Sequence, residues 1–456
     1  MTGFASDPGG GLFASQRGGV FMPPWATQNN GDVMVTKSPT LAQHFASSAN
    51  SDGSITLDPK ITFTRASSRI TTDANGRIGY LSANVAAAPF DPATLASKGL
   101  LIEEARTNLL TYSEQFDNAA WSKINVSVSA NATTAPDGTS TADSLLADAT
   151  AAGHYTQQSS ITLDGSSSYT FSVYLKKGAI DRAELLLDVG DTLYVQGYDL
   201  TTGSLITRIT GGVSTATGGF IQDVGDGWFR CGLTQTSDNT SGGARIILRE
   251  GDSLTSMSEG EGIYIWGAQL EEGSFPTSYI PTTTAAVTRS ADVYTSATTT
   301  RSADSAVMTG TNFTDWYNQS EGTLVVSCDS AVTPSAFNNN AILDISGDID
   351  NRITMLFRTQ SHLYVETGNV AQANIDAGTL SVNTNHTIAI SYKADDFNAV
   401  IDGGTVVNES SGTVPTTSSA IIGNRSDSNQ PLNGHIKSLT YYPARLTDAQ
   451  LQALTS

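Results

Sequence analysis

Short apolar runs bounded by polar turn residues dominate the chain, and they predict strands rather than helices. Between residues 108 and 284 the runs are separated by Gly, Asp or Ser, a spacing typical of antiparallel sheets. The same pattern returns after residue 320. Strands are expected at 168–178, 182–190, 192–200, 227–237, 244–251 and 262–273 in the first region, and at 322–328, 341–346, 352–358, 362–367, 387–393, 397–404, 420–424 and 434–443 in the second.

Several short strands at this spacing indicate antiparallel sandwiches, so we expect an all-β protein. Residues 108–284 are predicted to form a jelly roll, and residues 321–456 a second all-β domain. The remaining parts are an extended N-terminal segment at 1–36, a small β entry unit at 37–107, and a linker or hairpin at 285–320.

Three local signals add detail to this organisation. Asn75-Gly76 in the entry unit suits a type I′ hairpin. The closing segment 446–456 has the pattern of a short amphipathic helix, with Thr447 as N-cap and Gln450 as its capping-box partner. The motif Thr-Arg-Ser-Ala-Asp occurs twice around residues 288–304 and resembles a motif in the 60s, so these segments are predicted to pair as neighbouring strands.

The composition supports the β assignment and excludes some partners. Charged residues make up 15% of the chain, against about 25% in ordinary soluble proteins. Ser, Thr, Asn and Gly take their place, and these residues favour turns over helices. A net charge of −20 argues against nucleic acid, whose phosphates need basic partners. No apolar run approaches the ~20 residues of a membrane-spanning helix, so no membrane insertion is expected.

The N-terminal segment and the cysteines each allow two interpretations. Residues 1–36 are rich in Gly and Pro and carry four aromatic side chains. They form either a solvated tail or an anchor that docks on a larger assembly, and the aromatic residues favour the anchor. Cys231 and Cys328 lie in separate predicted domains, which favours two buried thiols over a disulfide.

Catalysis finds little support in the sequence. The five histidines are dispersed, and the chain has no GxSxG, HExxH or P-loop motif. We therefore expect no enzyme, no catalytic residues and no cofactor, although two acids brought together by folding would leave no local motif. Asp344, Asp348 and Asp350 could hold calcium, but an acidic hairpin turn is the simpler interpretation, and no metal site is expected.

Three segments resemble a widespread group of phage tail-fibre and head-fibre proteins. They are ITFTRASSRI…DANGRI from residue 61, GLLIEEARTNLLTYSE from residue 99, and IYIWGAQLEEGSFPTSYIPTTTAAVTRSADV from residue 263. In that group a jelly roll similar to carbohydrate-binding modules follows a small β entry unit. The closing GHIKSLTYYPARLTDAQLQAL looks like the last strand and helix of a laminin-G/concanavalin-like sandwich.

Two departures from the resembled pattern are visible. An Arg that often precedes Phe-Asp in the group is absent at Ala88-Pro89-Phe90-Asp91. Jelly-roll modules often end in a strand whose acids ligate a structural calcium, and here that strand carries Trp266-Gly267 at the acidic positions.

The resemblance implies a non-enzymatic fibre or spike protein of a phage or phage-like particle. It would bind host cell-surface polysaccharide and promote adsorption. Such a protein assembles in the host cytoplasm and is exposed on the virion, which agrees with an N-terminus that lacks the pattern of a secretory signal. Other virion proteins are expected partners of the N-terminal segment, and a homotrimer is the expected oligomer. The alternatives are a structural decoration or adaptor protein and a polysaccharide depolymerase.

Strand alternation selects candidate sugar-binding residues. In the segment 227–233, Phe229, Cys231 and Leu233 share one face, which leaves Trp228 and Arg230 on a solvent or cleft side. An exposed aromatic face can stack on a sugar ring, and polar groups can bind its hydroxyls. An isolated aromatic residue in a strand is more often a packing residue. The candidate carbohydrate-binding residues are Trp228, Arg230, Tyr174, Trp121 and Trp266.

Acidic residues flank both ends of the predicted jelly roll. Glu103, Glu104, Glu271 and Glu272 flank its entry and exit strands. A sandwich brings such strands together, so these acids are predicted to form a clasp that Arg106 or Arg289 neutralises. The preceding Leu-Leu-Ile is expected to be a strand, followed by a turn at 105–108. The polar loop 423–434 is a further candidate for ligand contact.

Overall fold

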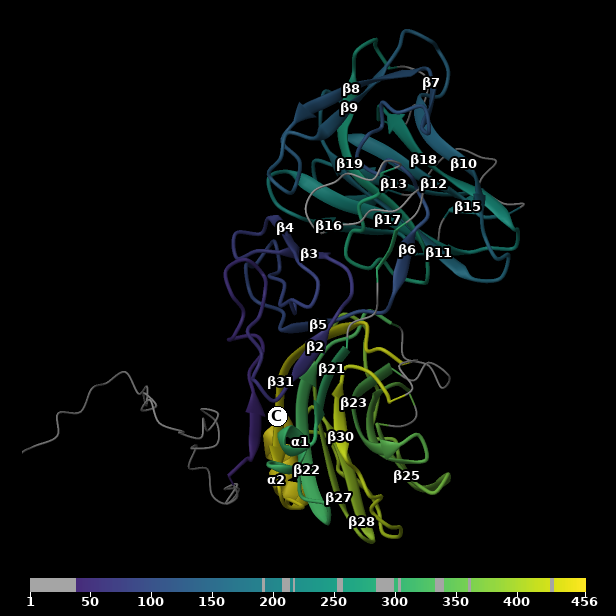
Figure 1. Ribbon diagram of the computed structural model, residues 1–456. Helices are drawn as coiled ribbons and strands as arrows, with labels where there is room; N and C mark the ends of the chain where they lie inside the picture. The colour runs from purple at the N-terminus through teal and green to yellow at the C-terminus, as the bar shows by residue number, and fades with distance from the viewer. Residues whose placement is uncertain are drawn as a thin grey trace, which may run out of the picture.

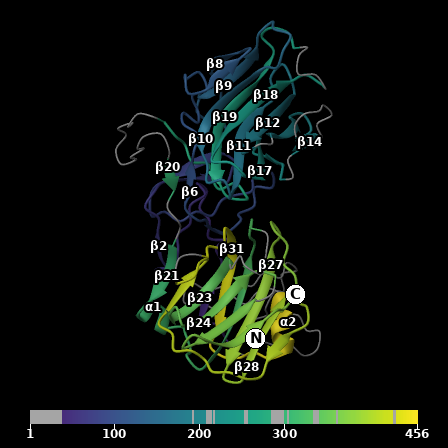
Figure 2. The same ribbon diagram turned by 90° about the vertical axis from the view of Figure 1, so that its right-hand side faces the viewer.

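The structure is a computed structural model of the 456-residue chain. It describes residues 38–190, 193–206, 214–215, 218–251, 257–283, 299–301, 305–332, 340–359, 362–426 and 430–456. The predicted N-terminal anchor lies outside these residues. Two antiparallel β-sandwiches are joined by a smaller region, as Figures 1 and 2 show. The predicted all-β fold with two sandwiches is therefore confirmed.

The jelly roll consists of two sheets that enclose a large apolar core. The first jelly-roll sheet has the order β14 (Ser204–Ile206), β13 (Leu193–Asp199), β12 (Arg182–Asp188), β18 (Ser241–Arg249), β10 (Tyr155–Thr162) and β7 (Ser122–Ile124), with β15 (Ser214–Thr215) beside β13. The second has the order β16 (Phe220–Asp223), β17 (Trp228–Thr236), β11 (Ser168–Lys176), β19 (Gly262–Glu272), β9 (Ala142–Ala147) and β8 (Val126–Thr133).

The C-terminal sandwich also has two sheets. The first C-terminal sheet has the order β1 (Leu41–Gln43), β31 (Gly434–Tyr442), β22 (Glu321–Cys328), β27 (His386–Lys393), β28 (Asp396–Ile401) and β29 (Val407–Glu409), with β5 (Leu100–Ile102) also paired to β31. The second has the order β2 (Thr62–Thr64), β21 (Ser305–Thr309), β30 (Ser419–Ile422), β23 (Asn340–Asp348), β24 (Asn351–Phe357), β25 (Leu363–Thr367) and β26 (Val370–Ile375).

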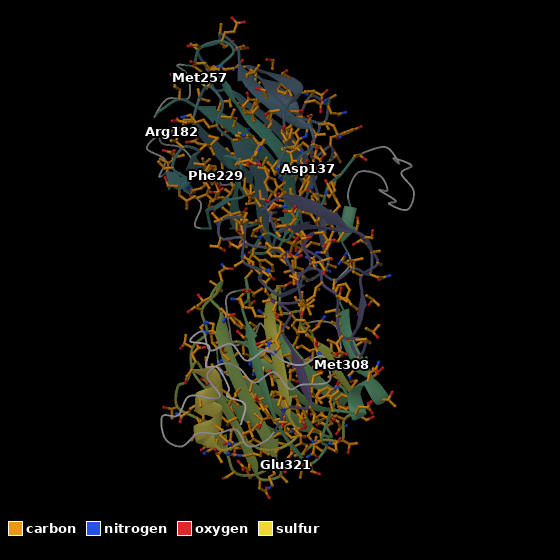
Figure 3. The ribbon with its side chains drawn as sticks, turned by 90° about the vertical axis from the view of Figure 1, so that its left-hand side faces the viewer. Asp137, Arg182, Phe229, Met257, Met308 and Glu321 are labelled. Atoms are coloured by element: carbon orange, nitrogen blue, oxygen red, sulfur yellow. The ribbon has the colours of Figure 1, made fainter. Side chains whose placement is uncertain are left out.

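Strands from the predicted entry unit are members of the C-terminal sheets. β1 and β5 pair with β31, and β2 pairs with β21. Buried side chains of this unit share one apolar core with the sandwich, among them Phe45, Ile55, Ile61, Leu100 and Ile102. The chain thus begins the C-terminal sandwich, builds the jelly roll, and returns to complete the sandwich. In Figure 3 the jelly roll carries Asp137 and Phe229, and the sandwich carries Met308 and Glu321.

The pairing of the 60s takes a form that the repeat motif did not specify. Phe63 in β2 lies opposite Ala306 in β21. β20 (Thr299–Arg301) pairs with β6 (Arg106–Asn108), which follows β5 after three residues. Residues 284–298, which hold one copy of the motif, lie outside the described chain. The turn expected at 105–108 is wrong, because Arg106–Asn108 is extended and paired.

The rest of the entry unit is a hairpin that packs on the jelly roll. β3 (Arg69–Thr72) and β4 (Ile78–Leu81) form it, and the Asp73 carboxylate accepts hydrogen bonds from the backbone N–H groups of Asn75 and Arg77 at 2.8 and 2.9 Å. A type I′ turn needs positive φ at both of its central residues. Gly76 has φ 78°, but Asn75 does not have positive φ, so the type I′ prediction is wrong.

The predicted closing helix and the predicted buried thiols are confirmed. Helix α2 (Asp448–Thr455) begins at N-cap Thr447, and Thr447 and Gln450 form the reciprocal capping box. A single-turn helix, α1 (Thr311–Thr314), precedes β22. Cys231 and Cys328 are buried free thiols. Neither helix of the described chain has the length and apolar character to cross a membrane.

The shared core predicts that the C-terminal sandwich does not fold without residues 38–107. A fragment that starts at Asn108 loses β1, β2 and β5 and the buried side chains listed above, each of which contributes about 1.5–3 kcal/mol on burial. We expect this fragment to lack cooperative thermal unfolding of the C-terminal sandwich, measured by near-ultraviolet circular dichroism against the full chain. Two cooperative transitions in the fragment would contradict the shared core.

Candidate ligand-binding site

Four of the five predicted sugar-binding residues lie on one face of the second jelly-roll sheet. Tyr174 on β11 lies opposite Arg230 on β17 and Trp266 on β19. The Tyr174 and Trp266 ring centroids are 5.2 Å apart, and Trp228 belongs to the same apolar cluster. The fifth residue, Trp121, lies in the jelly-roll core, with its ring 4.8 Å from Phe116. The structure therefore brings four candidates together and separates one.

Trp228 and Arg230 were expected on a solvent or cleft side, and neither faces open solvent. Arg230 and Tyr174 line a hollow beside the hairpin, which agrees with the cleft alternative. The five candidates are between 0% and 8% exposed. Ile70 and Ile78 from the β3–β4 hairpin cover the aromatic cluster, and Trp228 donates its indole N–H to the Thr134 carbonyl at 3.1 Å. Strand alternation assigned the faces correctly, since Cys231 and Leu233 enter the jelly-roll core. It could not show that a hairpin distant in sequence covers the opposite face.

Gly267 explains why this face departs from the acidic pattern of calcium-binding jelly rolls. It has φ 63°, and a Cβ there would lie 3.0 Å from the Tyr174 ring and 3.3 Å from the Tyr279 ring. The Trp266 and Tyr279 centroids are 5.0 Å apart. An L-residue at 267 would be strained and would crowd both rings. This position thus serves aromatic packing.

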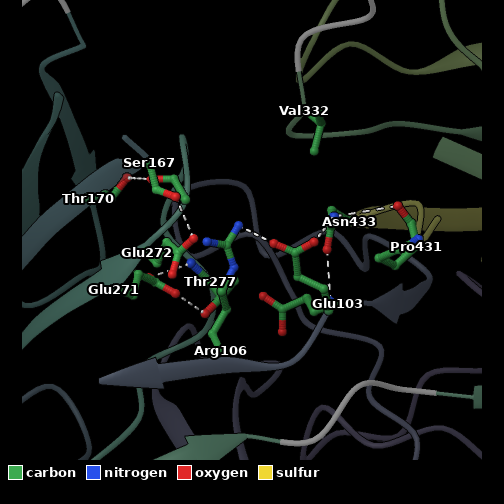
Figure 4. A network of polar contacts seen from close by, with 12 residues as sticks. Glu103, Arg106, Ser167, Thr170, Glu271, Glu272, Thr277, Val332, Pro431 and Asn433 are labelled. Atoms are coloured by element: carbon green, nitrogen blue, oxygen red, sulfur yellow. Dashed lines mark hydrogen bonds and ion pairs between the residues drawn. The ribbon is translucent and has the colours of Figure 1, made fainter. Parts of the chain in front are cut away.

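The predicted acidic clasp exists and joins all three parts of the molecule (Figure 4). Glu103 pairs with Arg69 of the hairpin and accepts hydrogen bonds from the Ser278 N–H and hydroxyl, both at 2.8 Å. Glu104 pairs with Arg106, which confirms one predicted neutralisation, and the Glu104 N–H donates to the Asn433 side chain at 2.8 Å. Arg289 lies outside the described residues.

The two acids at the other end of the jelly roll use hydroxyl and amide partners. The buried Glu271 carboxylate accepts hydrogen bonds from the Thr277 hydroxyl at 2.7 Å and the Gln269 amide at 2.6 Å. The exposed Glu272 accepts one from the Ser167 hydroxyl at 2.7 Å. Gly273 follows, and a Cβ there would overlap the Arg106 guanidinium. The chain needs glycine here for Arg106 to reach Glu104.

A polar cleft of about 980 Å³ lies beside this clasp, between the jelly roll and the C-terminal sandwich. We call it the clasp cleft. Its walls carry carboxylates, amides, hydroxyls and one guanidinium: Glu104, Asp164 and Glu272, then Asn340, Gln430 and Asn433, then Ser167, Ser168 and Ser274, and Arg106. The loop 423–434, a candidate from the sequence, thus supplies Gln430, Pro431 and Asn433.

Phe275 is the aromatic residue of the cleft that is not fully buried. It is half-buried, and the Arg106 guanidinium lies 4.9 Å from its ring centroid. It also lines a second, smaller hollow on the hairpin side. Phe275 was not among the candidates predicted from the sequence, although it lies in the GSFPTSY segment that carries the family resemblance. Its position directly after the predicted clasp was a usable signal.

The acidic segment 344–352 forms the hairpin between β23 and β24, with its turn at 349–350, as the simpler interpretation predicted. Asp344 is buried and accepts hydrogen bonds from the Thr354 hydroxyl at 2.6 Å and the Ser426 N–H at 2.9 Å. Asp348 accepts hydrogen bonds from the Asp350 N–H at 2.9 Å and the Asn351 amide. Among the residues that the structure describes, no group of three or more His, Cys, Asp or Glu side chains is arranged to hold a metal ion.

Comparisons with known proteins give partial structural likenesses only. No family model matches the chain, and no curated protein matches it. The carbohydrate-binding module CBM40 of the Ruminococcus gnavus IT-sialidase, solved with α2,3-sialyllactose, is 14% identical with a TM-score of 0.27, and the match covers 30% of this chain and 84% of that one.

Two further solved structures resemble parts of the chain. Domain 4 of an extracellular arabinanase from Geobacillus stearothermophilus, in complex with arabinotriose, is 14% identical with a TM-score of 0.27, and the match covers 34% of this chain and 73% of that one. Domains LG4-5 of the mouse laminin α1 chain are 8% identical with a TM-score of 0.23, and the match covers 67% and 91%. The fold assignment rests on the sheets described above.

Glu114 lies at the edge of the aromatic cluster and predicts a pH dependence of stability. Burial, and then the nearby Asp137, raise the pKa of this carboxyl to about 7, although the Tyr279 hydroxyl donates to it at 3.1 Å. A carboxyl whose pKa is raised by folding favours the native state when protonated. Its stabilising effect is therefore complete below the unfolded pKa, near 4.5, and is lost as the pH rises through about 7.

The variant Glu114→Gln tests this dependence. We expect it to raise the free energy of unfolding at pH 8 by about 2 kcal/mol, because the glutamine needs no proton. At pH 4.5 the difference should vanish. Urea unfolding of both proteins at the two pH values measures it. Equal stability of variant and wild type at pH 8 would show that the folded carboxyl is not perturbed.

Proposed function

We propose that this protein binds a cell-surface polysaccharide in the clasp cleft and does not cleave it. The observation that carries the proposal is the lining of the cleft, which combines carboxylates, amides, hydroxyls and Arg106 with the half-buried ring of Phe275. Saccharides present many hydroxyl groups and apolar C–H faces, and such mixed surfaces can bind both. The volume of about 980 Å³ has room for a short oligosaccharide.

The biological setting that we propose is the surface of a phage or phage-like particle. The resemblance of the ITFTRAS, EEARTNLL and GAQLEEGSFPTSYIPT segments to tail-fibre and head-fibre proteins supports it. In this setting the protein promotes adsorption to the host, and the N-terminal segment contacts other virion proteins. A homotrimer would present three clefts, so weak single-site affinity would be raised by multivalency.

The state of the acids supports binding rather than catalysis. Hydrolysis of a glycosidic bond needs one carboxyl as proton donor and a second as base or nucleophile. In the clasp cleft Glu104 is paired with Arg106, and Glu272 accepts a hydrogen bond from Ser167. His386 lies outside the cleft and also has partners at both ring nitrogens. Its Nδ1 contacts the Asp402 carboxylate at 2.6 Å, and its Nε2 accepts the Ser381 N–H at 2.9 Å.

The variant Phe275→Ala tests the cleft. We expect it to weaken binding of the full chain to extracted host surface polysaccharide about tenfold, because a stacking ring is worth roughly 1–1.5 kcal/mol. The purified variant should also need about a tenfold higher concentration to compete with particles for adsorption to polysaccharide-bearing cells. Biolayer interferometry and an adsorption assay measure the two effects.

Tyr364→Ala is the matched control. Tyr364 is also half-buried, and Arg352 lies over its ring at 5.7 Å, but it lies in the C-terminal sandwich away from the cleft. The Tyr364→Ala variant should bind polysaccharide as the wild type does. Equal binding by Phe275→Ala and wild type would refute the cleft as the site. Retention on particles without any effect on adsorption would favour the adaptor role, and release of reducing ends would favour a depolymerase.

A further inference from the structure

The second hollow, which we call the hairpin cavity, lies where the β3–β4 hairpin meets both sandwiches. Its volume is about 200 Å³, enough for one sugar residue. Phe275 and Asn433 line both this cavity and the clasp cleft, so the two hollows are neighbours. Thr71 and Thr72 of the hairpin, Gln222 and Arg230 of the jelly roll, and Asn383 of the C-terminal sandwich also line it.

Arg230 is the unusual residue of this cavity. It is 8% exposed, its NH2 group donates to the Ser172 hydroxyl at 3.1 Å, and its guanidinium lies 5.6 Å from the Tyr174 ring centroid. Its buried Nε–H has no hydrogen-bond partner, as is also true of Arg106 and Arg352, so the feature that sets Arg230 apart is its lack of a carboxylate. No carboxylate among the described residues is within ion-pair distance of it.

The other buried arginines of the described chain are compensated. Four form ion pairs with glutamates, and one donates to three backbone carbonyls. The pairs are Arg69–Glu103, Arg106–Glu104, Arg249–Glu184 and Arg352–Glu366, and Arg65 donates to the carbonyls of Ser67, Val85 and Ser82. Arg230 has one neutral hydroxyl and one ring instead.

An uncompensated buried guanidinium destabilises a fold, because the charge loses its hydration. A neutral residue of similar volume would pack against Tyr174 without that cost. A bound anion in the cavity would supply the missing charge and accept the free N–H groups, and guanidinium groups bind carboxylate, sulfate and phosphate well for this reason. The chemistry of Arg230 therefore fits a ligand more closely than it fits packing.

We propose that the hairpin cavity binds the acidic group of an anionic sugar residue, with Arg230 as its counter-charge. The amides of Gln222 and Asn383 and the hydroxyl groups of Thr71 and Thr72 are available for sugar hydroxyls, and Phe275 and Pro276 offer apolar contact. This inference deepens the proposed function, and rests on it only in taking the anion to be part of a polysaccharide. It narrows the ligand to acidic saccharides.

The other charges around the cavity are already paired. Lys98 lies 3.7 Å from Asp91, and Glu103 is held by Arg69. Asp329 accepts hydrogen bonds from the His435 N–H and from its Nδ1 at 2.9 Å. Burial pushes the pKa of Asp329 upward, but His435 outweighs burial and holds it below its ordinary value. Both cavity carboxylates thus have cationic or hydrogen-bonding partners, and Arg230 remains available to a ligand anion.

Thermal unfolding of the full chain with small sugar acids tests the inference. The probes are galacturonate, galactose 6-sulfate and glucose 6-phosphate, each compared with its neutral parent sugar. We expect at least one acid to raise the melting temperature of the wild type by about 3 °C at saturating concentration, with no effect of its neutral parent. Arg230→Met should lose this response, and Arg230→Lys should keep part of it.

Arg245→Met is the matched control. Arg245 also lies over a ring, 4.1 Å from the Tyr155 centroid, and donates to one neutral group, Gln157, but it is on the first jelly-roll sheet. The melting temperature of the Arg245→Met variant should rise with the sugar acid as that of the wild type does. Without ligand, Arg230→Met should unfold at a temperature equal to or above that of the wild type, because it removes an uncompensated charge.

Three outcomes would overturn the inference. They are a wild type that responds to none of the three acids, an equal response of Arg230→Met and wild type, or a ligand-free melting temperature of Arg230→Met well below that of wild type and Arg230→Lys. The last result would identify Arg230 as a structural residue. If polysaccharide binding depends on Phe275 but not on Arg230, the proposed function stands and this inference fails. If the protein shows an Arg230-dependent response to a sugar acid but does not bind polysaccharide, only the proposed function fails.

Discussion

The ion pair between Glu103 and Arg69 fixes the relative positions of the jelly roll, the β3–β4 hairpin and the C-terminal sandwich. Glu103 is 7% exposed and directly follows β5 of the C-terminal sandwich. It pairs with Arg69 of the hairpin. It also accepts two hydrogen bonds from Ser278, where the chain leaves the jelly roll. Breaking a buried pair by removing one partner costs about 3–5 kcal/mol, because the other charge stays buried. Glu103 lines the hairpin cavity, and the next residue, Glu104, lines the clasp cleft.

Asn108 makes the same junction rigid from the jelly-roll side. It is fully buried, and its amide donates to the carbonyls of Ala268 and Ile280 at 3.0 and 2.8 Å. Its side-chain oxygen accepts the N–H groups of Leu110 and Leu270, both at 3.1 Å. One side chain thus joins the strands that enter and leave the jelly roll. With the adjacent Glu103–Glu104 contacts, it fixes how the jelly roll sits on the sandwich.

Local patterns were sufficient to predict many of the strands, the closing helix and the acidic clasp, but they did not reveal strands β7 to β10 of the jelly roll. Alternation and turn residues located β11, β17 and β19 to within a few positions, because each strand carries its own periodicity. The capping box of Thr447 and Gln450 is equally local. The pairing of Arg106 with Glu104 was predictable because both residues adjoin the junction of the two strands.

The covering of the aromatic face and the composition of the clasp cleft were not predictable from local patterns. Trp228, Tyr174 and Trp266 have the pattern of a solvent-facing stripe, and residues distant in sequence, among them Ile70, Ile78 and Tyr279, cover them. The clasp cleft likewise combines residues from near 104, 164, 272 and 430. No periodicity within one strand reports which other segment covers its outer face. The loop 423–434 was a candidate because ligand sites of the resembled fold lie on loops at one rim, and its residues Gln430, Pro431 and Asn433 line the clasp cleft.

The net charge of −20 constrains how an anionic sugar could be selected. A distant polyanion gains nothing from the overall field of such a chain, and at physiological salt that field decays within about 8 Å. Discrimination must therefore come at contact, where Arg230 is shielded from water by the hairpin and by Tyr174. A recessed cation of this kind acts on the dissociation rate more than on encounter. The hairpin that covers the predicted aromatic platform is thus also an element that keeps the arginine behind it out of bulk water.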